Sequence, residues 1–150
     1  MAAAGTHIFR VALRDQPSTH RGIEIDSAKS LAEFAEAIVG AFGFEFDHAF
    51  GFYTETEGRA VMRGRPAYEL FANMSEATEA RSVKRTKIGE AFTEIGRAMT
   101  FLFDYGDEWL FRVELTALGR KAAKVRYPRV LAKAGSSPVQ YPDPDDEDED

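Results

Sequence analysis

The chain has 150 residues, a net charge of −6 and 44% hydrophobic residues, which suits one folded domain of ordinary size. It contains no Cys, which excludes a disulfide scaffold, a thiol nucleophile and a Cys-ligated metal. No apolar run is long enough to span a membrane, and the N-terminal residues lack the pattern of a signal peptide. We therefore expect a cytoplasmic protein that does not enter a membrane.

The negative charge is concentrated near the C-terminal end. Residues 143–150 contain seven acids, and without them 18 acids face 19 bases. Because seven carboxylates repel one another and have nothing to bury, we predict a folded domain over residues 1–134 and a disordered acidic tail over residues 135–150. The tail either keeps the protein soluble or folds back to screen the basic segment that precedes it.

Hydrophobic periodicity predicts the elements of the first third of the chain. Residues 7–14 and 21–26 alternate apolar and polar side chains, as in two strands joined by a turn. Ser30 and Glu33 have the spacing of a capping box, and apolar residues follow at helical spacing. This pattern predicts a helix over residues 30–42, ended by a glycine.

Beyond residue 43 the sequence predicts shorter elements and leaves one segment open. The expected elements are a strand over 48–54, an irregular connection over 55–67, a short strand over 68–71, a short helix over 88–95 and a hairpin of strands 99–105 and 109–118, with the state of 75–87 left open. Together they predict a single α+β domain with a mixed sheet of about five strands and one main helix packed on a face. The opening order of strand, turn, strand and helix is similar to a β-grasp fold.

The turn of the predicted hairpin carries the candidate catalytic residues Asp104, Asp107 and Glu108. Three carboxylates around one turn could bind a hard divalent cation or act in acid–base chemistry. Equally, Asp side chains accept backbone N–H groups and thereby shape tight turns. His48 would support hydrolytic or metal chemistry only if it shared a cleft with this turn. The common nucleotide-binding, metalloprotease and nucleophile-elbow motifs are absent, and we expect no metal and no cofactor.

A basic segment precedes the acidic tail. No acid occurs between Glu114 and Asp143, and residues 120–133 contain six bases. Such a segment either contacts nucleic-acid phosphates or forms a solvated surface after the last strand, and no helix with obvious groove-reading side chains accompanies it. The candidate nucleic-acid contacts are Arg120, Lys121, Lys124, Arg126 and Arg129.

Three separated blocks of the sequence resemble the plasmid Ri ORF-3-like family. Residues 30–43, followed by Asp47, His48 and Phe50, resemble its T-L-x-E-L-H-x-x-I-x-x-x-F-G-W helix and D-x-H-L-x-x-F segment. Residues 103–109 resemble its Y-D-F-G-D-x-W motif, and residues 127–129 its Y-P-R block. The resemblance covers roughly residues 7–130, with 55–85 unmatched. Two segments depart from the pattern: residues 19–21 replace I-W-R, and residues 137–142 replace a longer C-terminal block.

The resemblance implies a compact α+β domain in a family without an established activity, some of whose members are described as resolvase-like or as passenger proteins of mobile elements. No serine of this chain lies in a recombinase-like motif. The leading interpretation is a non-enzymatic binding or accessory module associated with mobile elements, with a protein or nucleic-acid partner. One alternative is a nucleic-acid-associated protein that uses residues 120–133, with the tail as a screen. The other is a hydrolase or metal-dependent enzyme that uses His48 and the 104–108 turn.

Overall fold

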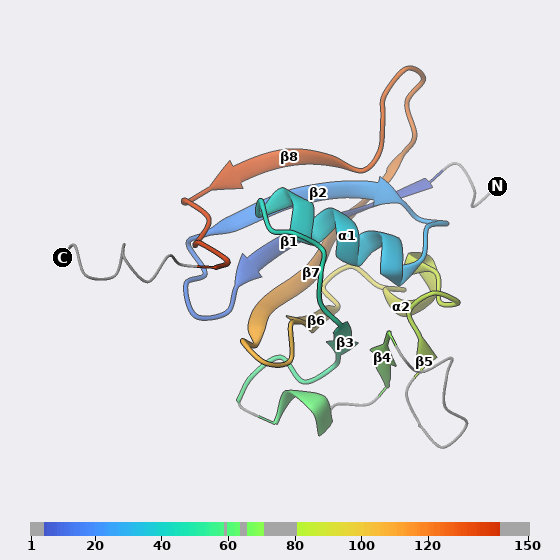
Figure 1. Cartoon of the computed structure of the whole chain (residues 1–150). Coiled ribbons are helices and arrows are strands. Elements are labelled where there is room, and N and C mark those ends of the chain that lie inside the picture. Colours follow the sequence, from blue (N-terminus) through green and yellow to red (C-terminus); the bar gives the residue numbers. More distant parts are fainter. Residues whose placement is uncertain (1–4, 59, 64–65, 71–80, 142–150) are drawn as a thin grey trace.

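Figure 1 shows the computed structural model of the chain, which describes residues 5–58, 60–63, 66–70 and 81–141. Two α-helices, one 3-10 helix and a single sheet make up the regular structure of these residues. The elements in chain order are β1 (Gly5–Leu13), β2 (His20–Asp26), α1 (Leu31–Ala41), β3 (Phe50–Tyr53), η2 (Val61–Arg63), β4 (Ala67–Glu69), β5 (Arg81–Ser82), α2 (Ile88–Ala91), β6 (Ala98–Phe103), β7 (Trp109–Arg120) and β8 (Arg129–Ala134).

The sheet has the strand order β5-β4-β3-β6-β7-β1-β2-β8, and its neighbours are antiparallel except for the parallel pair β4 and β5. The α+β class with one sheet is confirmed, but the expected number of about five strands is wrong, because the described residues form eight. The prediction missed β5, which has only two residues, and β8, whose side chains are nearly all exposed. Neither strand has the apolar alternation by which strands are recognised. The similarity to a β-grasp fold stays a prediction.

Helix α1 forms where the capping pattern predicted it. The Ser30 side chain accepts the Glu33 N–H at 3.1 Å, and the Glu33 carboxylate accepts the Ser30 N–H at 3.4 Å. The helix is followed by Gly43 at φ 73°, a conformation that glycine adopts without steric cost. Its buried residues are Leu31, Phe34, Ala35, Ile38 and Val39.

These side chains pack on one face of the sheet, across which α1 lies in Figure 1. The aromatic residues of the sequence fill this layer. The ring of Phe34 lies 4.3 Å from that of Phe9 on β1 and 5.8 Å from that of Phe52 on β3. The ring of Phe52 in turn lies 4.8 Å from that of Phe101 on β6. The burial of these rings is the main driving force for placing α1 on the sheet.

A smaller apolar cluster combines the buried residues Tyr53, Val61, Ala67 and Leu102 and includes the 3-10 helix η2. The Tyr53 hydroxyl donates to Glu69 and lies 2.8 Å from the Tyr105 hydroxyl. Burial, together with these two hydrogen bonds, raises the pKa of Tyr53 far above its usual value.

Arg21 on β2 is fully buried, which no local pattern of the sequence predicted. Its guanidinium donates to the carbonyl oxygen of Ala134 at 2.8 Å and to that of Ala41 at 3.2 Å, and it lies 4.8 Å above the ring of Phe42. It also donates to the Ser137 hydroxyl at 2.7 Å. This one side chain therefore joins the end of α1, the end of β8 and the segment that follows β8.

Two other expectations bear on the chain after α1. The helix expected over 88–95 is shorter and ends at Ala91. Residues 135–141, which the sequence analysis assigned to the tail, are described by the structure, whereas the acidic run 143–150 and residues 75–80 lie outside the described residues. Within the described ranges, no helix combines the length and apolarity needed to cross a lipid bilayer.

Candidate functional site

The 104–108 turn is shaped by the side chain of Asp104. Asp104 has φ 68°, and its Oδ1 accepts the N–H groups of Gly106 at 3.1 Å and Asp107 at 3.2 Å. Its backbone carbonyl accepts the Glu108 N–H at 2.6 Å. Asp tolerates this left-handed backbone conformation better than most residues because its short side chain bonds locally. One oxygen of Asp104 therefore has a structural role in the hairpin.

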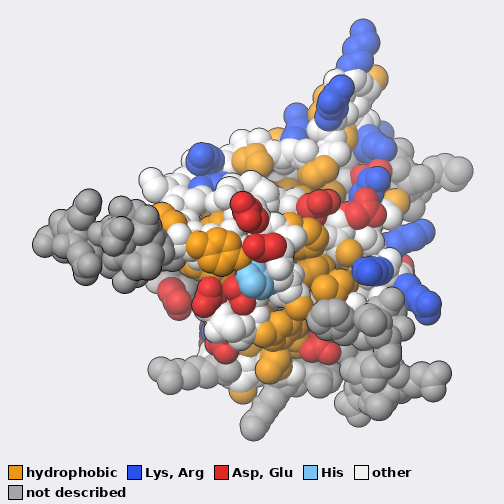
Figure 2. All heavy atoms as spheres, in the orientation of Figure 1, with side chains coloured by type: hydrophobic (Ala, Val, Ile, Leu, Met, Phe, Trp, Pro, Cys, Tyr) orange, Lys and Arg blue, Asp and Glu red, His pale blue; other side chains and the backbone are white. Residues whose placement is uncertain are grey.

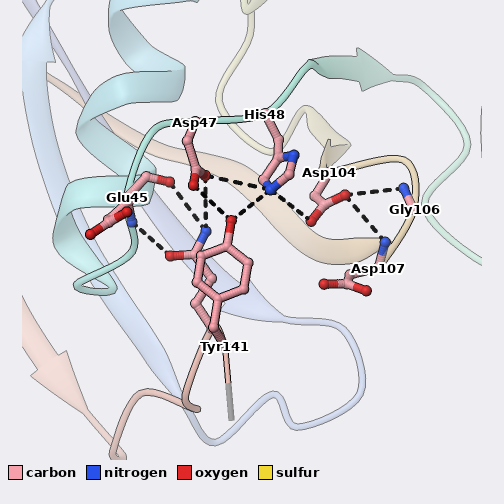
Figure 3. A network of polar contacts seen from close by, with 8 residues as sticks. Glu45, Asp47, His48, Asp104, Gly106, Asp107 and Tyr141 are labelled. Atoms are coloured by element: carbon pink, nitrogen blue, oxygen red, sulfur yellow. Dashed lines mark hydrogen bonds and ion pairs between the residues drawn. The ribbon is translucent and has the colours of Figure 1, made fainter. Parts of the chain in front are cut away.

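The other oxygen of Asp104 faces His48. His48 Nε2 lies 3.3 Å from Asp104 Oδ2 and 2.6 Å from the hydroxyl of Tyr141, as Figure 3 shows. The Tyr141 hydroxyl donates to Asp47 Oδ2 at 2.7 Å, which leaves its oxygen free to accept from the imidazole. The hydrogen bond to Asp47 is the main reason that the pKa of Tyr141 is raised to about 12. His48 and Asp104 thus meet, as the enzymatic interpretation required.

The side chains of Asp107 and Glu108 do not join this network. They line a different cavity of about 710 Å³, together with Arg14 and Leu102, and neither His48 nor Asp104 lines it. In Figure 3 the Asp107 carboxylate carries no dashed line to any residue drawn. No group of three or more His, Asp and Glu side chains in the described ranges is arranged to hold a metal ion. The four candidate catalytic residues are therefore divided between an exposed polar network and a separate cavity.

Sequence analysis missed two members of the polar network. Gln140 accepts the Glu45 N–H at 2.7 Å and donates to the Glu45 carbonyl at 3.2 Å, and Tyr141 binds Asp47 and His48 as described above. These contacts join residues more than 90 positions apart, and no local pattern predicts them. The only available signal was that residues 137–142 lack the acids of the tail.

Residues 120–133, named here the basic arm, run from β7 to the edge strand β8 through a connection that projects beyond the sheet. The arm comprises the last residue of β7, the connection that follows and most of β8, and Figure 1 shows the connection standing away from the other strands. Within the arm the Tyr127 hydroxyl accepts the Ala122 N–H at 3.0 Å, and the Arg129 guanidinium lies 5.5 Å from the Tyr127 ring. The Tyr127 side chain thus stabilises the arm.

Two of the arm's bases are paired with acids of β2. The Arg129 guanidinium lies 2.7 Å from the carboxylate of Glu24, and the Lys121 ammonium lies 2.9 Å from that of Asp26. Burial alone would raise the pKa of Glu24, but hydrogen bonds from Thr6 and Arg129 and the charge of Arg129 outweigh it, and the pKa is lowered. These two candidate nucleic-acid contacts therefore fix the base of the arm.

The other bases of the arm are exposed. In the part of the chain that the structure describes, their side chains have no hydrogen-bond or ion-pair partner. Figure 2 shows Lys and Arg side chains gathered along the arm and at its tip. The residues concerned are Arg120, Lys124, Arg126 and Lys133.

A comparison with protein-family models matches residues 6–141 to the family described as plasmid pRiA4b ORF-3-like protein. This match spans nearly all the described residues. The chain belongs to the plasmid pRiA4b ORF-3-like family.

The three sequence blocks that resemble the family can be located in this ORF-3-like fold. The first contains α1, the second is the 104–108 turn with its flanking strand ends, and the third leads from the connection of the basic arm into β8. The match extends to residue 141 and so includes the segment that carries Gln140 and Tyr141.

The fold occurs in a solved structure as well. A crystal structure of a protein of unknown function from Methanosarcina mazei Go1 superposes with a TM-score of 0.71 at 17% identity, covering 89% of this chain and 71% of that one. At this identity the similarity shows the fold alone. No curated protein matches the chain.

Proposed function

We propose that this ORF-3-like protein is a binding or accessory module that contacts nucleic acid through its basic arm, in association with mobile elements. The single observation that carries the proposal is an arm with a projecting connection and four exposed cations that have no acidic partner among the described residues. The plasmid origin in the family's name supports the setting. A nucleic-acid partner is compatible with the cytoplasmic location that the sequence predicts.

The charge distribution supports a polyanionic ligand. Residues 115–142 contain no acid, so a phosphate chain can approach the arm without meeting a carboxylate of that segment. Each phosphate that a Lys or Arg neutralises releases condensed counterions, which favours binding most at low salt. The ion pairs of Lys121 and Arg129 with β2 hold the base of the arm, so the exposed bases are presented with little loss of conformational freedom on binding.

The form of the arm indicates how it would bind. Its projecting part, over residues 121–128, is an irregular connection, because β7 and β8 do not pair with each other. Helix α1 packs its apolar face on the sheet and α2 has only four residues, so we expect no recognition helix. Contacts to the phosphate backbone position a protein without reading the bases. We therefore propose binding to duplex DNA with little sequence preference.

The test compares two matched double variants. Lys124→Asn with Arg126→Gln removes two charges from the arm tip, and Asn suits the left-handed backbone at position 124, where φ is 68°. Lys84→Asn with Arg85→Gln removes the same charge from two exposed residues outside the arm. Fluorescence anisotropy with a labelled DNA duplex at about 50 mM salt measures binding. We expect the arm variant to bind at least about tenfold more weakly and the control to bind like the wild type.

An absence of binding by the wild type, or an equal loss in both variants, would contradict the proposal. The enzymatic interpretation has less support, because Asp107 and Glu108 line a cavity that His48 does not reach. The acidic tail as a screen of the arm stays part of the proposal and has its own test below.

A further inference from the structure

A second histidine of the chain is paired with a serine. His7 on β1 is only 6% exposed, and each of its ring nitrogens meets one polar group. Nδ1 lies 2.7 Å from the Ser27 hydroxyl oxygen, and Nε2 lies 2.9 Å from the carbonyl oxygen of Phe92. A carbonyl oxygen can only accept, so Nε2 carries the proton, and Nδ1 of the neutral imidazole is left as an acceptor. The Ser27 hydroxyl therefore donates to His7.

This pair has the geometry of an activated serine. A nucleophile of this kind needs a base within hydrogen-bond distance and a third group that orients the base. Here His7 is the base, and the Phe92 carbonyl fixes the orientation and tautomer of its ring. The negative end of that carbonyl dipole also favours the imidazolium that forms when His7 takes up the serine proton.

A cavity of about 520 Å³ opens beside the pair and is lined by both residues. A Cβ placed on Gly89 would lie 3.8 Å from Cε1 of His7 and 3.5 Å from the carbonyl oxygen of Ser27, so a longer side chain there would occupy space beside the pair. Gly5 and Gly119 also line the cavity, as do Lys87 and Glu90, which carry opposite charges. The volume falls within the range of small-molecule sites.

We propose that Ser27 is the nucleophile of an acyl-transfer site that accepts small, activated carboxylic esters and is independent of the basic arm. The backbone N–H groups of Ser27, Ala28 and Gly89 already donate to oxygen atoms of the protein. They are therefore not available to the oxyanion, whose stabilisation falls to the charge of Lys87. The Glu90 carboxylate offsets part of this charge, which restricts the chemistry to esters with good leaving groups.

The reaction has two balanced halves. The Ser27 oxygen bonds to the ester carbonyl carbon while its proton passes to His7 Nδ1, and that proton then leaves with the alcohol as the ester C–O bond breaks. A water molecule next attacks the acyl carbon and gives a proton to His7 Nδ1. That proton returns to the Ser27 oxygen as the acyl bond breaks and the carboxylic acid departs.

A fluorophosphonate probe tests the site on the full chain. The Ser27 oxygen would displace fluoride and gain one phosphonyl group, which intact mass and peptide mapping locate. We expect a single adduct on Ser27, none in Ser27→Ala, and labelling at least about tenfold slower in His7→Gln, which lacks the base. Gly89→Leu should also slow labelling, because its side chain fills space beside the pair. Ser136→Ala and His20→Gln, which leave the pair intact, should label like the wild type.

An adduct absent from Ser27, or formed there at the same rate in His7→Gln, would overturn the proposal. Near-UV circular dichroism checks that His7→Gln folds. If it does not fold, Gly89→Leu decides: labelling of Ser27 at the wild-type rate in that variant contradicts the proposal. Ser27→Ala should bind DNA like the wild type, so a failure here is distinct from a failure of the nucleic-acid proposal.

Discussion

The guanidinium of Arg129 and the carboxylate of Glu24 form an ion pair at 2.7 Å that ties the edge strand β8 to β2. Glu24 is 4% exposed, and its second oxygen accepts a hydrogen bond from Thr6 at 2.6 Å. Because β8 itself is largely exposed and buries little apolar surface, this pair has a large share in positioning the strand. It also explains why one of the six bases of the arm is not available to a ligand.

Removing the cation of this pair should destabilise the protein. Arg129→Gln leaves a buried carboxylate with only Thr6 as its partner, and we expect a loss of about 1–2 kcal/mol in the free energy of unfolding, since the Arg side chain is partly solvated. Urea denaturation measures it. Lys133→Gln, which removes an exposed cation without a partner, should change stability by less than about 0.5 kcal/mol. Equal effects of both changes would show that the pair does not position β8.

The same pair makes stability depend on pH. The pKa of Glu24 is lower in the folded protein than in the unfolded chain, where it is about 4.3. Its contribution is therefore complete above that value and is lost as pH falls through the folded pKa. Unfolding free energies measured from about pH 7 down to about pH 3 should fall less steeply for Glu24→Gln than for the wild type. Parallel curves would contradict this assignment.

Arg21 should be important for both stability and the order of the segment after β8. Arg21→Met keeps the apolar contact with Phe42 but leaves the carbonyl of Ala134 and the hydroxyl of Ser137 without their donor. We expect a loss of about 2–4 kcal/mol, because buried acceptors lose their partners. Hydrogen exchange should quicken in residues 130–137 more than in α1. A uniform change would show that Arg21 stabilises the domain without a specific effect on this segment.

Deletion of residues 143–150 tests the tail as a screen. The deletion removes seven acids and leaves 18 acids against 19 bases. If the tail competes with DNA for the arm, the truncated protein should bind a duplex more tightly, and the difference should shrink at high salt because both interactions are electrostatic. A variant with the seven acids changed to Asn and Gln controls for length. If the truncated protein and the neutralised variant both bind DNA like the wild type, the tail has no role in the proposed function.

The sequence predicted those parts of the fold that local patterns determine. Helix α1 followed from its capping box and apolar stripe, and the β6–β7 hairpin from two apolar runs around a turn. The exposed strand β8 could not be predicted, because its position depends on pairing with β2 and on Glu24, which is more than 100 residues away. Arg21 was unpredictable for the same reason, since its guanidinium donates to carbonyl groups of two distant segments, the end of α1 and the end of β8.

The sequence predicted only part of the candidate sites. The structure brings His48 and Asp104 together, as one interpretation required, but directs Asp107 and Glu108 to another cavity. Position along a turn does not determine the direction of neighbouring side chains. The pairing of His7 with Ser27 was not predicted, because twenty residues and a strand connection separate them and no motif marks such a pair.

The salt dependence of duplex binding tests the central proposal most directly. Four phosphate contacts predict that the logarithm of the association constant falls with the logarithm of salt concentration with a slope of about −3.6. For Lys124→Asn with Arg126→Gln the slope should drop to about −1.8, whereas Lys84→Asn with Arg85→Gln should keep the wild-type slope. A slope near zero for the wild type, or the same slope for the arm variant, would contradict the role of the basic arm.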